Sequence, residues 1–300
     1  MSTKIDRRDF VRAGLAGAAL LTAGLDLRAA EARKPKLKKA VKYGMIGAGK
    51  TIKEKFELIK RLGFQGVEID SPQGLPNRVE LMLAQEDTGI KVHGVIDSVH
   101  WQDTLSSSDA AVRAKGLASL KAALHDAAFF GADTVLLVPG VVKDGVTYEQ
   151  CWERSQAEVR KALPLAEKLG VKIACEVVWN NFITKPEQML EYVDSFKSPW
   201  VGTYFDCSNM IKYGVPSAEW IRRLGKRVLK FDFKGFSLAK FEKKENPWVN
   251  IGEGDENWPE IIKALGEVGY DGWATAEVNK GDEAYLKDVA DRMNKGLELG

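Results

Sequence analysis

The feature that most constrains the fold of this chain is a regular alternation between short apolar runs and longer segments with helical spacing. Eight apolar runs of strand length are expected at 41–46, 66–70, 91–96, 134–138, 171–178, 201–205, 228–233 and 273–278. A segment with helical periodicity follows each run. Strict alternation indicates a parallel sheet, and eight units favour closure into a single-domain α/β fold, the (β/α)8 TIM barrel. The alternative is an open, doubly wound sheet.

The composition is that of an ordinary globular protein. With 45% hydrophobic and 29% charged residues, the chain is neither disordered nor collagen-like in its body. A net charge of +2 without a long basic run gives no support for nucleic-acid binding. The three cysteines, Cys151, Cys175 and Cys207, cannot all pair, so no disulfide framework is expected.

The first residues have the features of an export signal. A twin arginine occupies positions 7–8, a short apolar run covers 13–25, and the Ala-x-Ala sequence at 30–32 provides a cleavage site. Because these features occur in the required order, we expect residues 1–32 to be a Tat signal peptide. The alternative is an amphipathic N-terminal helix with a chance arginine pair.

This signal defines the expected domain organisation. Removal of residues 1–32 would leave a short linker at 33–40 and a TIM-barrel catalytic domain at 41–300. The mature protein would be periplasmic or otherwise exported, without membrane contact after cleavage of the signal.

Four consecutive predicted strands, the fifth to the eighth, each carry one carboxylate near the carboxyl end: Glu176, Asp206, Asp232 and Glu277. In a TIM barrel these strand ends meet at the face that carries the chemistry. Four carboxylates buried together require compensating positive charge, and their oxygens are ligands that hard cations prefer. We therefore expect these four residues to bind one divalent metal ion, Mn²⁺ or Mg²⁺. For any one of them, the alternative is a buried ion pair with Lys172, Lys230 or Lys234.

Four stretches of sequence are more specific than this pattern. They read Cys-Glu-Val-Val-Trp-Asn-Asn-Phe at 175–182, Tyr-Phe-Asp-Cys-Ser-Asn at 204–209, Ile-Gly-Glu-Gly-Asp at 251–255 and Gly-Tyr-Asp-Gly-Trp-Ala-Thr-Ala-Glu at 269–277. In these stretches the chain resembles the xylose isomerase-like TIM-barrel family of sugar isomerases and epimerases. Within that family it is most similar to the branch of ribulose-phosphate 3-epimerases and hexulose-phosphate isomerases. The resemblance implies one divalent metal ion bound by carboxylates on strands five, six and eight, which Glu176, Asp206 and Glu277 match.

The resemblance also implies a reaction, which is proton transfer next to a carbonyl group. A metal-dependent isomerase or 3-epimerase would act on a ketose or related sugar through an enediolate, with Glu176 and Glu277 as paired acid and base. Export argues against a sugar phosphate and favours a free sugar, a keto-sugar or an oligosaccharide fragment. The alternatives are a lyase acting on keto-glycosides at the same site, and a sugar-binding protein that has lost the metal.

Two positions depart from the family pattern. Asp232 stands on strand seven where relatives commonly have a histidine ligand, which favours Mg²⁺ or Mn²⁺ over Zn²⁺ or Co²⁺. Alternatively, the metal is lost and Asp232 pairs with Lys234 or Lys230. Asn209 stands where many relatives have a substrate-contacting histidine, and an amide can donate a hydrogen bond to a sugar hydroxyl but cannot titrate.

Further polar and aromatic residues near the strand ends are expected to bind a small-molecule sugar: Glu68, His100, Trp101, Asn180, Asn209 and Lys234. Glu68 could equally form a supporting ion pair, and His100 could be purely structural. Trp101 offers an apolar platform for a sugar ring, and Asn180 resembles a substrate-contacting asparagine of the family. The resemblance is also compatible with a homo-oligomer.

Overall fold

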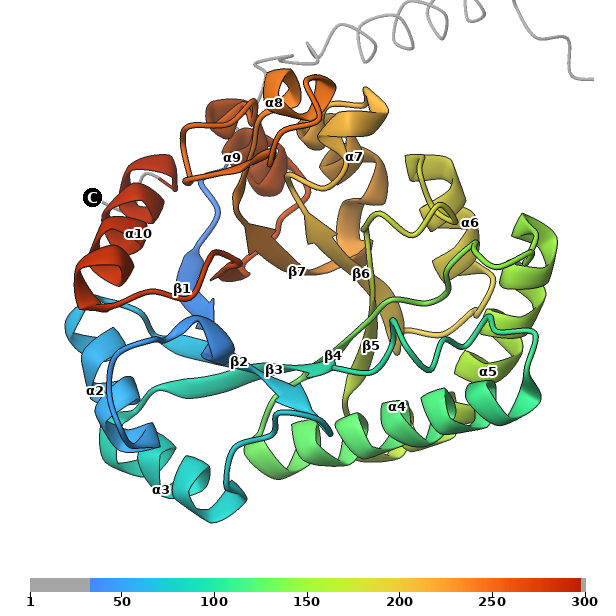
Figure 1. Cartoon of the computed structure of the whole chain (residues 1–300), viewed down its shortest axis with the longest axis horizontal. Coiled ribbons are helices and arrows are strands. Elements are labelled where there is room, and N and C mark those ends of the chain that lie inside the picture. The colour runs from blue at the N-terminus through green and yellow to red at the C-terminus, as the bar shows by residue number, and fades with distance from the viewer. Residues whose placement is uncertain (1–32, 298–300) are drawn as a thin grey trace, which may run out of the picture. The chain divides into compact units, whose positions relative to one another are not determined.

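The structure of the chain, a computed structural model, describes residues 33–297. Eight parallel strands form a closed barrel in the order β1-β10-β7-β6-β5-β4-β3-β2, and helices surround it (Figure 1). The strands are β1 (Leu37–Lys42), β2 (Gly66–Ser71), β3 (Lys91–Asp97), β4 (Thr134–Leu137), β5 (Lys172–Glu176), β6 (Val201–Asp206), β7 (Val228–Phe233) and β10 (Gly272–Ala276). The prediction of a single TIM barrel is therefore confirmed.

A helix follows each strand of the barrel, as the alternation in the sequence predicted. These helices are α2 (Ile52–Arg61), α3 (Arg78–Thr88), α4 (Ala110–Phe130), α5 (Tyr148–Leu169), α6 (Pro186–Asp194), α7 (Ser217–Leu224), α9 (Trp258–Glu267) and α10 (Glu283–Gly296). Local signals define their ends. Thr51 and Thr147 begin α2 and α5 with capping boxes, and Gly131 ends α4 in the left-handed conformation with φ of 76°.

The first strand begins earlier than predicted. β1 starts at Leu37, inside the expected linker 33–40, and pairs in parallel with β10 from Leu37↔Gly272 to Val41↔Ala276. Three lysines at positions 38, 39 and 42 concealed this strand, because a lysine usually marks a solvent-exposed site. Here the side chains of Lys39 and Lys42 are both buried. The predicted signal peptide, 1–32, lies outside the residues that the structure describes.

An excursion between β7 and α9 was not predicted. It consists of strand β8 (Gly235–Phe236), helix α8 (Leu238–Glu242) and strand β9 (Trp248–Val249). The two strands pair in an antiparallel ladder, with Phe236 opposite Trp248. Each strand is only two residues long, too short for a periodicity signal. Gly235 permits the pairing because a Cβ there would overlap the carbonyl of Asn250.

Apolar side chains fill the space between the strands and the surrounding helices. The barrel interior has only a small apolar cluster, formed by Leu136, Ala174 and Tyr204 with Ile96 and Leu229 packed against it. Polar and charged side chains occupy much of the remaining interior. The apolar cluster is therefore a thin layer, and reactive polar groups can lie next to it inside the barrel. Within residues 33–297, no helix is both long and apolar enough to cross a membrane.

Candidate active site

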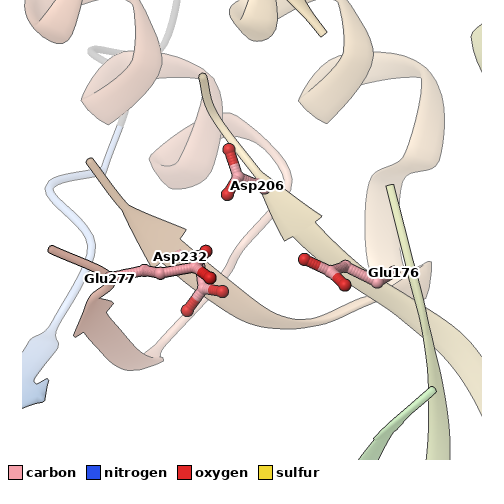
Figure 2. A group of neighbouring side chains, drawn as sticks. All are labelled: Glu176, Asp206, Asp232 and Glu277. Atoms are coloured by element: carbon pink, nitrogen blue, oxygen red, sulfur yellow. The ribbon is translucent and has the colours of Figure 1, made fainter. Parts of the chain in front are cut away.

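The four carboxylates that the sequence singled out come together at the carboxyl ends of adjacent strands. Glu176 ends β5, Asp206 ends β6, Asp232 lies one residue before the end of β7, and Glu277 directly follows β10. One oxygen from each lies within 4.8 Å of the others, and the side chains converge from neighbouring strands (Figure 2). The pairing of Asp206 with Asp232 across β6 and β7 shows that strand register creates part of this cluster.

Two lysines are interleaved with the carboxylates. Lys42 Nζ lies 2.9 Å from Asp232 Oδ2 and 3.4 Å from Glu277 Oε1. Lys234 Nζ lies 2.9 Å from both Asp206 Oδ2 and Glu277 Oε2. Glu277 therefore bridges the two ammonium groups, and each lysine also neutralises one buried aspartate.

The partner of Asp232 differs from those considered in the sequence analysis. Asp232 pairs with Lys42, the last residue of β1, and not with Lys234 or Lys230. Lys230 points toward the amino-terminal ends of the strands, where its Nζ donates to the carbonyl of His93 at 3.0 Å and contacts Asp133 at 2.7 Å. Lys230 and Asp232 lie two residues apart on the same face of β7, so their side chains enter the interior at different depths.

Burial and neighbouring charges act differently on the two glutamates. Burial, followed by the charge of Glu277, raises the pKa of Glu176 to about 8. Burial also opposes the charged form of Glu277, but Lys42 and Lys234 outweigh it and hold the pKa of Glu277 well below its usual range. Glu277 is therefore the carboxylate and Glu176 the more readily protonated partner.

The charge balance leaves room for a cation. With all groups ionised, five carboxylates, the four of the cluster and Glu68, face two ammonium groups, which gives a formal charge of −3. Glu68 is buried, and its Oε2 lies 3.8 Å from Lys42 Nζ. Among the described residues, Asp232 Oδ1 has no hydrogen-bond partner despite full burial. A divalent ion would reduce the excess charge to −1, and an all-oxygen donor set suits Mg²⁺ or Mn²⁺. The residues present thus fit a divalent metal ion.

A cavity of about 400 Å³ opens onto the cluster. Its lining combines charged, polar and aromatic side chains with parts of the strand ends: Lys42, Gly44, Met45, Asp70, Ile96, Ser98, His100, Trp101, Leu136, Glu176, Val178, Asn209, Lys234 and Glu277. Asp206 and Asp232 are fully buried and lie beneath this lining. A small ligand in the cavity would therefore contact Glu176 and Glu277 directly.

The structure places four of the six predicted sugar-binding residues in this lining: His100, Trp101, Asn209 and Lys234. Asn180 is elsewhere. It is fully buried, and its Oδ1 accepts hydrogen bonds from the backbone amides of Phe182 and Ile183, at 3.1 and 3.0 Å. Its side chain therefore shapes the loop after β5. Glu68 lies below the cavity, next to Lys42.

His100 is held in one protonation state. Its Nδ1 accepts a hydrogen bond from the backbone amide of Val138 at 3.2 Å. Burial, together with the charge of Lys42, lowers the pKa of His100 to about 3. The ring is therefore neutral at ordinary pH with its proton on Nε2, so it can donate one hydrogen bond.

Sequence reasoning missed Lys42, Asp70 and Ser98 as site residues. Asp70 and Ser98 lie at or just beyond the ends of β2 and β3, the positions from which the other candidates were chosen. Lys42 was missed because the first strand was expected at 41–46, which put this lysine near its beginning. The correct strand boundary would have placed Lys42 at a carboxyl end with the others.

Comparison with known proteins agrees with this architecture. The family model described as "Xylose isomerase-like TIM barrel" matches residues 56–296. The L-ribulose-5-phosphate 3-epimerase UlaE of Salmonella paratyphi A is 25% identical over 272 residues, which cover 83% of this chain and 93% of that protein. The prediction of a sugar isomerase or epimerase agrees with the names of such relatives.

Solved structures share the fold at low sequence identity. The 3-keto-D-glucoside 4-epimerase YcjR of E. coli has a TM-score of 0.72 at 16% identity, and the match covers 88% of this chain and 100% of that one. An L-ribulose 3-epimerase has a TM-score of 0.71 at 19% identity, and the match covers 88% of this chain and 95% of that protein. The IolI protein, determined with a zinc atom, has a TM-score of 0.73 at 17% identity, with 88% and 99% covered.

The closed barrel, its carboxylate cluster and a family match that spans most of the chain lead to one conclusion: the protein belongs to the xylose isomerase-like TIM barrel family.

Proposed function

We propose that this protein is a divalent-metal-dependent 3-epimerase of a neutral ketose or keto-sugar. The observation that carries the proposal is the position of Glu176 and Glu277, which line one cavity and belong to one carboxylate cluster. Relatives named as sugar 3-epimerases support the reaction class. Isomerisation to an aldose is the same type of reaction at the other side of the carbonyl group: a proton leaves C1 instead of C3, and a proton returns to C2.

The two glutamates have environments suited to opposite roles. Glu277 is in contact with both Lys42 and Lys234, so it is charged and can accept the proton next to the substrate carbonyl. Glu176 forms no ion pair with any residue of the described range and faces the same cavity from a different strand of the barrel. This position allows Glu176 to return a proton to the substrate carbon.

The carboxylates Glu176, Asp206, Asp232 and Glu277 would hold the metal ion. When bound, a divalent cation supplies Lewis-acid polarisation of the substrate oxygens. The lysines contribute separately. They keep Glu277 ionised at the rim of the cluster and limit the repulsion among the buried carboxylates.

The charges around the cavity favour a neutral substrate over a phosphorylated one. Lys42 and Lys234 are both engaged by carboxylates, and Asp70 adds a further acidic group to the lining. No arginine of residues 33–297 lines this cavity, although arginine is the usual side chain for bidentate recognition of phosphate. Trp101 is 37% exposed and offers an aromatic face to a sugar ring.

Metal content and proton exchange together test the proposal. Wild type, Glu176→Gln and the control Glu158→Gln, a buried glutamate of α5 that pairs with Lys161, are purified without chelator and assayed for bound divalent metal. Wild type and Glu158→Gln are expected to retain one ion per chain, and Glu176→Gln to bind it at least about tenfold more weakly.

Neutral ketohexoses are then incubated with the metal-loaded protein in D₂O. Exchange at C3 with formation of the C3 epimer supports a 3-epimerase, whereas an aldose product identifies an isomerase. Elimination from a keto-glycoside without epimer formation would identify a lyase instead. Sugar binding without exchange, unaffected by chelator, would contradict the proposal and identify a binding protein.

A further inference from the structure

A second cavity adjoins the first one. It has a volume of about 430 Å³ and shares Met45, Lys234 and Glu277 with the cavity above the carboxylate cluster. The remaining wall comes mainly from the excursion after β7 and from the segment after β10. We call this space the outer cavity. Because both cavities share Glu277, a ligand held at the carboxylates can extend into the outer cavity.

Trp248 of β9 forms one wall of the outer cavity, and 37% of its surface is exposed. Its ring stacks on Trp179 with centroids 5.1 Å apart and meets Phe236 edge to face at 5.4 Å. Trp179 is in turn fixed by a hydrogen bond from its Nε1 to the carbonyl of Asn209 at 2.5 Å. The tryptophan is therefore held in place before any ligand arrives, which lowers the entropy cost of binding.

The polar lining of the outer cavity fits hydroxyl groups. Three asparagines, Asn246, Asn250 and Asn279, reach it together with Tyr285. Amide and phenol groups both donate and accept hydrogen bonds, as sugar hydroxyls do. An aromatic ring beside several such groups is a common composition for a carbohydrate site, because the apolar face of a sugar packs on the ring.

The charges of the outer cavity do not favour an anion. Lys234 and Lys240 are balanced by Glu253 and Glu277 in the same lining. Lys234 is engaged by Glu277 at 2.9 Å. The four charged side chains sum to no net charge, so the lining offers a phosphate group no net electrostatic attraction and does not oppose a neutral sugar.

We propose that the outer cavity is a subsite for a second sugar ring, so that the substrate is a glycosylated ketose rather than a free monosaccharide. The inference rests on the proposed function, since the ketose unit occupies the cavity at Glu176 and Glu277. The second ring packs against Trp248 and donates to or accepts from the asparagines. The excursion after β7 thereby determines the length of the substrate.

The probes that test this subsite are fructose, its 4-O-glucosyl and 6-O-glucosyl derivatives and fructose 6-phosphate. Their dissociation constants for the metal-loaded protein are measured by titration calorimetry, and C3 proton exchange is followed in D₂O. At least one glucosyl derivative is expected to bind about tenfold or more tightly than fructose. Fructose 6-phosphate is expected to bind no more tightly than fructose.

Two substitutions and a control locate the gain in affinity. Trp248→Ala is expected to reduce the ratio of disaccharide to fructose affinity about tenfold, and Trp248→Phe to restore much of it. The control is Phe129→Ala, which removes another exposed aromatic side chain, 53% exposed, from α4. It should leave the ratio at the wild-type value.

The outcomes separate the subsite from the proposed function. If fructose binds and exchanges its C3 proton but neither glucosyl derivative binds more tightly, the subsite is refuted and the epimerase proposal stands. Tighter binding of fructose 6-phosphate would show that the outer cavity holds a phosphate instead. If no probe binds or exchanges, both proposals are overturned.

Discussion

Lys42 is the residue around which the charges of the site are arranged. It is buried at the end of β1 and contacts Asp232, Glu277 and Glu68 within 3.8 Å. Burial disfavours its charge, but Asp232 and the other carboxylates hold its pKa well above the usual range. The cluster is therefore an ion network in which no member can be removed without leaving a neighbour uncompensated.

Removal of Lys42 should therefore be costly. Lys42→Met is expected to lower the free energy of unfolding by about 3 kcal/mol or more, because buried carboxylates lose their compensating charge. Urea unfolding of the metal-free protein at neutral pH measures the effect. The double variant Lys42→Met/Asp232→Asn should recover part of the loss, and a single variant as stable as wild type would contradict this reasoning.

At the scale of elements, the contacts between strand ends and helices place titratable groups in buried positions. Asp97 ends β3 and is almost fully buried, and its Oδ1 accepts a hydrogen bond from Ser119 of α4 at 2.5 Å. Burial raises the pKa of Asp97 from 3.8 to about 7. The folded state therefore binds a proton that the unfolded state has already released between about pH 4 and pH 7.

The sign of this linkage predicts that Asp97→Asn becomes more stable relative to wild type as the pH rises. The Asp97 contribution to stability is greatest below its unfolded pKa and decreases as pH rises toward about 7, by up to about 1.4 kcal/mol per pH unit. The free energy of unfolding of Asp97→Asn, measured in urea relative to that of wild type, should thus rise by up to about 3 kcal/mol between pH 5 and pH 7. Asp144→Asn, at an exposed loop position, is the matched control. A stability difference that does not change with pH would refute the linkage.

Close packing of a helix against a loop gives a second prediction at this scale. Gly116 lies in α4, and a Cβ there would overlap the backbone oxygen of Asp103 and meet Leu105 at 3.0 Å. Although alanine is a better helix former by about 1 kcal/mol, Gly116→Ala should destabilise the fold by about 2 kcal/mol. Gly131→Ala, at the open C-terminal cap of the same helix, should cost only about 1 kcal/mol. Thermal or urea unfolding compares the two, and the reverse order would contradict the packing argument.

At the scale of the whole molecule, a network of ion pairs occupies the interior of the barrel at the carboxyl ends of its strands. β1 and β10 come from opposite ends of the chain and pair directly with each other. β1 ends at Lys42, and Glu277 directly follows β10. Closure of the sheet through this pairing brings Lys42 to the carboxylates. A ligand that binds only the closed barrel must stabilise the whole fold.

Metal binding should consequently be visible in the melting temperature. At a Mn²⁺ concentration about one hundred times its Kd, linkage gives about 2.7 kcal/mol of stabilisation, or a rise in Tm of roughly 5–10 °C for a chain of this size. Thermal unfolding with Mn²⁺ and with EDTA measures the difference. Asp206→Asn should lose most of the rise, and an equal Tm under both conditions in wild type would argue against a bound metal. Export and a homo-oligomeric state remain predictions at this scale.

The sequence alone determined the architecture and the residue types of the site. Each strand and helix has its own hydrophobic period and local end signals, so the eight alternating strand–helix units could be predicted without tertiary information. Glu176, Asp206, Asp232 and Glu277 were readable as a group for the same reason, since carboxyl ends of parallel strands meet at one face. The predicted strand at 41–46 was wrong because lysines concealed the true β1.

Only the tertiary structure decided which charges meet. Lys42 and Asp232 are far apart in sequence and are joined by barrel closure, and Asn180 was directed into its own loop by local amide donors. The role of Trp248 could not be predicted, because the strands and the helix of the excursion after β7 are too short to show a hydrophobic period. Ion pairs and cavities depend on the relative depth and register of strands, and that information exists only once the barrel has closed.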